Sequence, residues 1–344
     1  MKRISVRKSA ILIIIFFTCS GDSTGDITEP IPHAPPTANT ADNLFFNTQF
    51  LAQYDLVAKI LLTQKGFEEI RFIAHDGIEL HGLWRKHPHA SYSILFCAGF
   101  YPGRKEGLAS FIEIAPTDCN LLFFDARGHG KSGGRFFSNL HNYGVDEYKD
   151  IIGALDFIKK ETNMPIFIHG ICAGAFNAAH AIAHINTKEY RIKGLIFDSG
   201  ILSIPEACHV PEKYFCQKII AQMLSKLYPQ DTKKTIQERL LYKILSFATG
   251  KIMNLATVLI KPFLESNEAK TKLTADHFMK IQCPLLFIHS YDDGYVSLEE
   301  ISQLAATIPH AEHWWLENSE HALHHLKHTD EYQRTFINFV IKNI

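Results

Sequence analysis

The sequence has no excess of charge of either sign. Its 344 residues include 35 Lys or Arg and 36 Asp or Glu, so the formal net charge is −1. Nucleic-acid-binding domains generally carry a basic face, and this balance therefore argues against a nucleic-acid partner.

The chain also lacks the spacings of common metal and phosphate sites. It has no Cys-x-x-Cys and no His-Glu-x-x-His, and the glycine-rich stretch 125–132 has no P-loop lysine pattern. Histidines do gather near the C-terminus, which is the one feature that could suggest a metal: His313, His321, His324, His325 and His328. Without a supporting motif we expect neither a metal nor another cofactor.

The N-terminal apolar run is too short to span a bilayer, which takes about 20 residues. It covers Ala10 to Phe17, follows four basic residues and precedes Cys19. This order is typical of a bacterial export signal, with Cys19 where a lipoprotein carries its lipid, although the residues before Cys19 deviate from the usual lipoprotein pattern. We expect an exported protein, periplasmic or membrane-anchored through a lipid on Cys19. Ordinary secretion and an uncleaved anchor remain alternatives.

The order of apolar segments divides the rest of the chain. Residues 1–19 are the expected signal, and 20–41, rich in Ser, Thr, Gly, Asp and Pro, form an expected flexible tether. Short apolar strands alternate with helices over 42–200 and 282–344, which predicts an α/β core with a mostly parallel sheet covered on both faces. Between them, 201–281 shows only helical periodicity and predicts a helical cap.

Several local patterns refine this prediction. Asp76-Gly77 between two apolar runs predicts a hairpin. Arg104 to Ala115 fits a helix, and a further apolar helix is expected over Asp42 to Leu62.

One segment carries the residue pattern of a catalytic nucleophile. Cys172 stands in Gly170-Ile171-Cys172-Ala173-Gly174, between an expected strand and an Ala-rich expected helix. In a Gly-x-nucleophile-x-Gly turn, small neighbours let the chain turn sharply and lift the nucleophile clear of the sheet. The start of the helix stabilises negative charge, and the backbone N–H of Ala173 faces any oxyanion formed there. By itself the motif is weak, because a buried cysteine at a turn has the same pattern.

Two later segments supply partners for this nucleophile. A carboxylate turn, Asp292-Asp293, follows the expected strand Pro284 to His289, and His321 follows the expected last strand. The chain order nucleophile, acid, histidine is that of the α/β-hydrolases. Three such groups in this order, each just after a strand, together favour a catalytic triad.

From Glu68 to the C-terminus the chain resembles the α/β-hydrolase superfamily, near its serine-aminopeptidase-like and monoacylglycerol-lipase-like members. Residues 76–82 resemble their early hairpin, and 124–132 resemble their Asp-x-Arg-Gly-His-Gly-x-Ser loop. The resemblance implies the α/β-hydrolase fold and an oxyanion hole formed by the N–H groups of Phe100 and Ala173. It also implies that Asp293 is the acid, with Asp292 a structural neighbour, and that His321 is the base.

His324 and His325 are expected to begin the following helix.

Two residues of the expected site depart from the family pattern. The nucleophile is cysteine, as in dienelactone-hydrolase-like members, and Ala98 replaces the usual histidine before Gly99.

A cysteine nucleophile narrows the expected substrates. A thiolate leaves a tetrahedral intermediate more readily than an alkoxide does, so the intermediate formed from a simple alkyl ester tends to expel the cysteine and collapse back to the ester. We therefore expect a hydrolase acting on small-molecule acyl substrates: thioesters, lactones and activated esters. An acyltransferase and a non-catalytic binding protein on the same fold are the alternatives.

Of the other cysteines, Cys208 and Cys216 are the closest candidates for a disulfide.

Overall fold

The computed structural model describes residues 57–344, except 101–102, 104, 135–141, 206–261, 263–264 and 269. The expected signal, the expected tether and the larger part of the expected cap lie outside these residues, as do Cys19, Cys208 and Cys216. The domain boundaries proposed from the sequence therefore stay predictions. Of the helix expected over 42–62, residues 57–64 are described and are helical.

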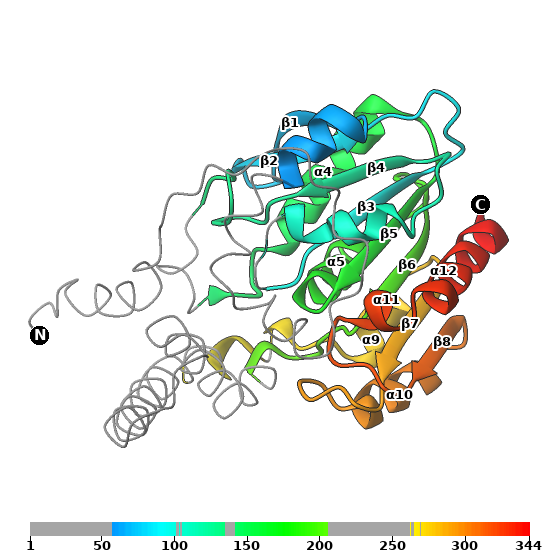
Figure 1. The fold of residues 1–344 in the computed structure, drawn as a ribbon. Helices are drawn as coiled ribbons and strands as arrows, with labels where there is room; N and C mark the ends of the chain where they lie inside the picture. The colour runs from blue at the N-terminus through cyan, green and yellow to red at the C-terminus, as the bar shows by residue number, and fades with distance from the viewer. Residues whose placement is uncertain are drawn as a thin grey trace, which may run out of the picture.

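A single eight-stranded sheet forms the centre of the molecule, in the order β1-β2-β4-β3-β5-β6-β7-β8 (Figure 1). Strands β1, β2 and β4 pair antiparallel, and the remaining pairs are parallel. This confirms the mostly parallel sheet predicted from the sequence. The strands are β1 (Glu68–Ile73), β2 (Glu79–Arg85), β3 (Ser93–Cys97), β4 (Asn120–Phe124), β5 (Ile166–Ile171), β6 (Ile192–Asp198), β7 (Leu285–Ser290) and β8 (Ala311–Leu316).

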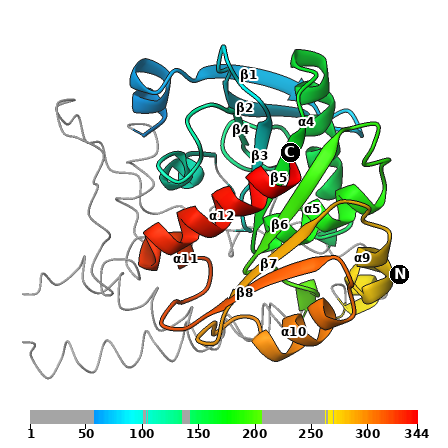
Figure 2. The same cartoon turned by 90° about the vertical axis from the view of Figure 1, so that its right-hand side faces the viewer.

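Helices cover both faces of the sheet, and α12 crosses in front of it in Figure 2. They are η1 (Lys105–Ile112), α4 (Tyr148–Glu161), α5 (Ala173–Ala183), α9 (Ala275–Met279), α10 (Leu298–Ala306), α11 (His324–Lys327) and α12 (Thr329–Asn343). Residues of α4, α5, α9 and α10 contribute to one buried apolar cluster, and residues of η1 and α12 to the other. Among the helices of the described residues, none is both long enough and apolar enough to cross a membrane.

Successive residues of a strand pack alternately into these two cores. In β3, Leu95 and Cys97 pack into the core with α4 and α5, whereas Ile94 and Phe96 pack into the core with η1 and α12. Successive side chains of a strand point to opposite faces, so a strand buried on both sides reads as a continuous apolar run. This is why the sequence predicted the central strands well.

Local details both confirm and correct the predictions. The hairpin between β1 and β2 turns at Gly77, whose φ is +90° and whose N–H donates to the carbonyl of Ala74 at 2.9 Å. The helix expected over Arg104 to Ala115 is present over Lys105–Ile112, where it is a 3₁₀ helix. Helix α11 begins at His324, as predicted. Helix α10 was not anticipated.

The parallel strands bring distant residues to one edge of the sheet. Strands β3, β5, β6, β7 and β8 run parallel, so the segments that follow their carboxyl ends lie together. Those segments contain Gly99, Cys172, Ser199, Asp293 and His321. In open parallel sheets this edge is where ligands bind.

Candidate active site

Cys172 occupies a strained turn between β5 and α5. Its φ is +55° and its ψ −121°, a conformation that non-glycine residues adopt only when the surrounding structure enforces it. The turn requires glycine at both Gly170 and Gly174, because a Cβ at either position would overlap with neighbouring atoms. A Cβ on Gly170 would lie 2.4 Å from the Cα of Ala175, and one on Gly174 would lie 2.2 Å from the carbonyl oxygen of Cys97. The Gly-x-Cys-x-Gly pattern thus has a direct steric cause, and the turn has the sharp strand-to-helix geometry that is typical of a nucleophile elbow.

The thiol of Cys172 differs from the other described thiols in its surroundings. Cys97, Cys119 and Cys283 are buried, whereas Cys172 is only partly buried. Burial raises the pKa of the Cys119 and Cys283 thiols to about 12, and it also raises the pKa of Cys97. These three thiols are therefore uncharged and enclosed at neutral pH.

His321 lies between Asp293 and Cys172. Its Nδ1 is 2.8 Å from Oδ2 of Asp293, and its ring also forms a hydrogen bond with the Cys172 side chain. Burial alone would lower the pKa of His321, but charge on Cys172 and Asp293, with the hydrogen bonds to both, raises it well above its usual value. The ring is thus held next to both a thiol and a carboxylate, an arrangement in which it could exchange a proton with either.

Asp293 is held rigidly in the turn after β7. Its side chain is fully buried, and its Oδ1 accepts hydrogen bonds from the N–H groups of Tyr295 and Val296 at 2.8 and 3.0 Å. Burial would raise the pKa of Asp293, but the contacts with His321 and His289 and the backbone donors lower it below its usual range. The carboxylate is therefore charged and aimed at His321.

The neighbouring Asp292 has a different partner. Its Oδ2 accepts the N–H of Asn318 at 2.6 Å, which ties the turn after β7 to the loop after β8. It is Asp293, not Asp292, that the structure brings to His321, in the register expected from the family resemblance.

The two expected oxyanion donors come from different loops. Ala173 is the first residue of α5, so its N–H has no carbonyl one turn earlier within the helix. Phe100 follows Gly99, where a Cβ would lie 3.2 Å from the Cβ of Cys172. The β3 loop thus packs directly against the nucleophile elbow.

The loop 125–132 supports this arrangement from behind. Lys105 is fully buried, and its Nζ contacts Oδ2 of Asp125 and Oε1 of Glu106, each at 2.8 Å. His129 forms a hydrogen bond with the backbone of Phe100. The burial of Lys105 was not predicted, because a lysine next to a glutamate normally indicates a solvated surface. Its buried ion pair with Asp125 holds the start of η1 to the loop 125–132.

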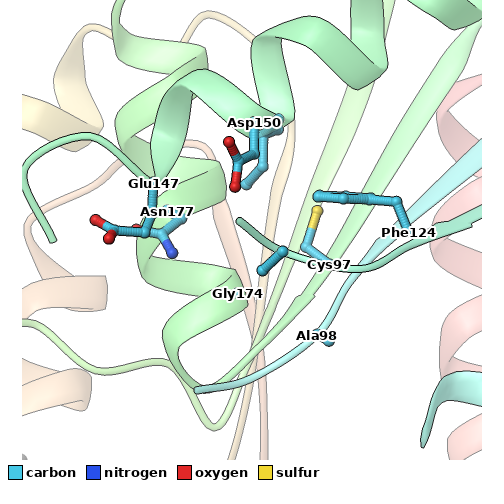
Figure 3. Close-up of a pocket in the computed structure, with 9 residues that line it drawn as sticks. Cys97, Ala98, Phe124, Glu147, Asp150, Gly174 and Asn177 are labelled. Atoms are coloured by element: carbon cyan, nitrogen blue, oxygen red, sulfur yellow. The ribbon is translucent and has the colours of Figure 1, made fainter. Parts of the chain in front are cut away.

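A small cavity lies behind the elbow, among side chains of β3, β4, α4 and α5 (Figure 3). Its volume is about 20 Å³, enough for one water molecule and too small for an acyl group. The residues that line it include Cys97, Phe124, Asp150, Gly174 and Asn177. The Oδ1 atom of Asn177 is buried without a hydrogen-bond partner, which fits a single water as the occupant.

The clustered histidines have separate places. His313 stacks on Trp315 at 4.8 Å, and His325 stacks on Phe111 at 4.0 Å. His328 bonds the carbonyl of Glu317 at 2.9 Å. Within the described part of the chain, no three or more His, Cys, Asp or Glu side chains are grouped so that they could hold a metal ion.

Comparisons with known proteins agree with this geometry. The family model described as "Serine aminopeptidase, S33" matches residues 104–328. The uncharacterized protein YqkD of Bacillus subtilis (strain 168) is 27% identical over 252 residues, which cover 72% of this chain and 70% of the relative.

Solved structures share the fold. An esterase of Pyrococcus furiosus, Pf2001, superposes with a TM-score of 0.57 at 18% identity and covers 80% of this chain and 91% of its own. A membrane phospholipase A described as a bacterial virulence factor superposes with a TM-score of 0.58 at 16% identity, covering 89% of this chain and 95% of its own. At these identities the likeness concerns the fold alone.

Proposed function

Because the chain belongs to the serine aminopeptidase S33 family and is therefore a hydrolase with the α/β-hydrolase fold, we propose that it hydrolyses acyl substrates through a Cys172–His321–Asp293 triad. The family usually has serine as nucleophile, and position 172 here is cysteine. The observation that carries the proposal is His321, which lies between a carboxylate and the thiol and has a raised pKa.

The first half of the reaction forms an acyl-enzyme. The thiol proton of Cys172 passes to His321 as the sulfur bonds to the acyl carbon, and the electrons of the carbonyl bond move to its oxygen. The N–H groups of Phe100 and Ala173 stabilise this oxyanion. When the intermediate collapses, the bond to the leaving group breaks and the proton on His321 passes to the leaving group.

The second half releases the acid. His321 takes a proton from water as the water oxygen bonds to the acyl carbon, and the carbon–sulfur bond then breaks to return the thiolate. Asp293 keeps the imidazole in the correct tautomer throughout and stabilises its cation.

The nucleophile also decides which substrates suit the site. In each tetrahedral intermediate, Cys172 competes with the leaving group of the substrate for expulsion. A thiolate leaves more readily than an alkoxide, so the intermediate formed from an alkyl ester expels Cys172 and collapses back to the substrate. The intermediate formed from a thioester, an aryl ester or a lactone with a stabilised leaving oxygen expels that leaving group and forms the acyl-enzyme. The proposed substrates are therefore small activated acyl compounds.

A comparison of leaving groups tests this function. The wild-type protein and Cys172→Ala are assayed with an alkyl ester, an aryl ester and a thioester that carry the same acyl chain. We expect the thioester and the aryl ester to react at least about tenfold faster than the alkyl ester, a difference of about 1.4 kcal/mol in barrier, and we expect no turnover by Cys172→Ala. A burst measurement excludes a slow shared deacylation. Equal rates without a burst contradict the mechanism, and inactivity of folded, reduced protein favours a binding protein.

We also propose that the protein is exported and attached to the membrane through a lipid on Cys19. The support is the order of basic residues, apolar run and cysteine at the N-terminus. Metabolic labelling with a radioactive fatty acid tests it: Cys19→Ala should lose the label and leave the membrane fraction. Membrane retention without any label in the wild-type protein would instead support an uncleaved anchor.

A further inference from the structure

A second buried polar cluster lies beneath the His321 loop, at the end of β6. It centres on Asp198 and Ser199, which are 1% and 0% exposed. The backbone carbonyl of Asp198 accepts the N–H of Cys172 at 2.9 Å. The hydroxyl of Ser199 accepts the N–H of Ala322, the residue after His321, at 3.0 Å. Two consecutive residues thus bond to the chain at the nucleophile and next to the base.

The hydrogen bonds around Ser199 can be assigned without conflict. Its hydroxyl donates to Oδ1 of Asp198 at 3.1 Å, so the Nε2 of His324, at 2.7 Å, must donate to the Ser199 oxygen. The Nδ1 of His324 then accepts the hydroxyl proton of Ser319 at 2.8 Å. Burial lowers the pKa of His324, which agrees with this neutral ring.

Asp198 is anchored from the other side as well. The hydroxyl of Tyr332 donates to its Oδ2 at 2.6 Å, and the Nε2 of His169 lies 2.6 Å from the Tyr332 oxygen. Burial by itself would raise the pKa of Asp198, but the hydrogen bonds of His169 and Tyr332 help to lower it below its usual range. Asp198 is therefore a fixed, charged acceptor that orients Ser199.

The loop that carries His321 needs such support. Asn318 and Ala322 have positive φ values of 57° and 60°, and Ser199 itself has a φ of 49°. A non-glycine residue in this conformation is strained and persists only where its surroundings hold it. Before His321 the loop is held by the bond from Asn318 to Asp292, and after it by the bond from Ala322 to Ser199.

Ser199 and His324 resemble a nucleophile and its base, but they cannot act as one. Both side chains are 0% exposed, and Asp198, Ser319 and Tyr332 enclose them, so no substrate reaches the hydroxyl. The cluster can instead fix the position of the loop that carries His321 relative to the end of β6.

We propose that Ser199 is a positioning residue that sets His321 over Cys172, by holding the N–H of Ala322 with a hydroxyl that Asp198 and His324 orient. This inference rests on the proposed function. Ser199 does not touch the reacting atoms, so its removal acts through the placement of His321.

The experiment compares Ser199→Ala and Ser199→Gly with Ser93→Ala. The glycine variant removes the same hydroxyl but relieves the positive φ, so it keeps the test decisive where the alanine variant folds poorly. Ser93 is the matched control. It is 0% exposed and accepts a hydrogen bond from Asn120 at 3.1 Å. It lies at the first residue of β3, at the end of the strand away from the candidate site. Circular dichroism and melting temperature confirm folding.

Three readouts separate positioning from stability: kcat, KM, and the pH profile of Cys172 alkylation by iodoacetamide. Both Ser199 variants should lower kcat for an aryl ester by about tenfold to a hundredfold with little change in KM, because misplacing a catalytic group by about 1 Å costs this much. The alkylation profile should move to higher pH. Ser93→Ala should lose thermal stability but keep both activity readouts.

The outcomes also separate this inference from the function on which it rests. If the wild-type protein turns over substrate and both Ser199 variants match Ser93→Ala in kcat and in alkylation, the positioning role is overturned and the proposed function stands. If folded wild-type protein neither turns over nor reacts at Cys172, the proposed function falls, and this inference with it.

Discussion

Two histidine–aspartate pairs lie side by side at the carboxyl edge of the sheet and differ in what surrounds them. His321 bonds Asp293 and Cys172, and its side chain is 9% exposed. His324 lies 3.6 Å from Asp198, is 0% exposed, and is enclosed by the hydroxyls of Ser199 and Ser319. The pKa of His321 is raised and that of His324 is lowered.

The comparison shows that the partner of a histidine, more than burial alone, decides its chemistry. Both rings lose solvation, which lowers the pKa of each. Only His321 interacts directly with both Cys172 and the carboxylate of Asp293, and these two partners overcome the loss. His324 meets hydroxyls instead, and stays a neutral link in a fixed network. One pair is thus suited to proton transfer and the other to holding the chain.

Removing the two carboxylates in turn is the strongest test of this contrast. We expect Asp293→Asn to lower kcat by about 10⁴-fold, because the amide favours the wrong imidazole tautomer. Asp198→Asn should lower kcat by roughly tenfold to a hundredfold, through misplacement of His321. Steady-state rates with a thioester measure both. Equal losses would mean that the two pairs do not have separate roles.

Thiol reactivity sharpens the comparison from the side of the nucleophile. Among the cysteines that the structure describes, only Cys172 contacts a histidine with a raised pKa, whereas burial raises the pKa of Cys119 and Cys283 to about 12. Limiting iodoacetamide at neutral pH should therefore label Cys172 faster by about a hundredfold or more. Peptide mapping by mass spectrometry gives the ratio. Labelling led by another described cysteine would contradict the assignment of the nucleophile.

Much of the fold was predictable because the central strands are buried on both faces and read as apolar runs. The candidate triad was also predictable: each of Cys172, Asp293 and His321 follows a strand, and parallel strands bring such segments together. The type of η1 was not, since its apolar spacing fits an α-helix as well as a 3₁₀ helix.

The second pair was invisible in the sequence for a physical reason. Asp198-Ser199-Gly200 reads as an ordinary polar turn after a strand, and nothing local marks the first two residues as buried. Their partners, Ala322, His324 and Tyr332, are more than 120 residues away. Only the folded chain brings these groups together, so only the structure could assign Ser199 a role.

Acid unfolding provides a thermodynamic version of the comparison. Neighbouring groups lower the pKa of Asp198 in the folded state, so its contribution is complete above the unfolded value of about 3.9 and is lost as pH falls through the folded value. Asp198→Asn should therefore cost about 2 kcal/mol of unfolding free energy at pH 7. The cost should be smaller, but not absent, at pH 3, because only part of the contribution is lost between the unfolded pKa and pH 3. Urea unfolding at both pH values measures this, with Asp118→Asn, an exposed aspartate, as control. A cost that does not change with pH would contradict the charged state of Asp198.

The smallest expected effect concerns Asp292, the neighbour of the acid. Asp292→Asn keeps an oxygen that can accept the N–H of Asn318, the bond that holds the loop before His321. Because the variant leaves the Asp293–His321 contact intact, kcat should fall by less than about tenfold, against about 10⁴-fold for Asp293→Asn. Side-by-side assays with the same aryl ester give both values. If the two losses were reversed, Asp292 would be the acid, and the pairing of Asp293 with His321 would not be the one used in catalysis.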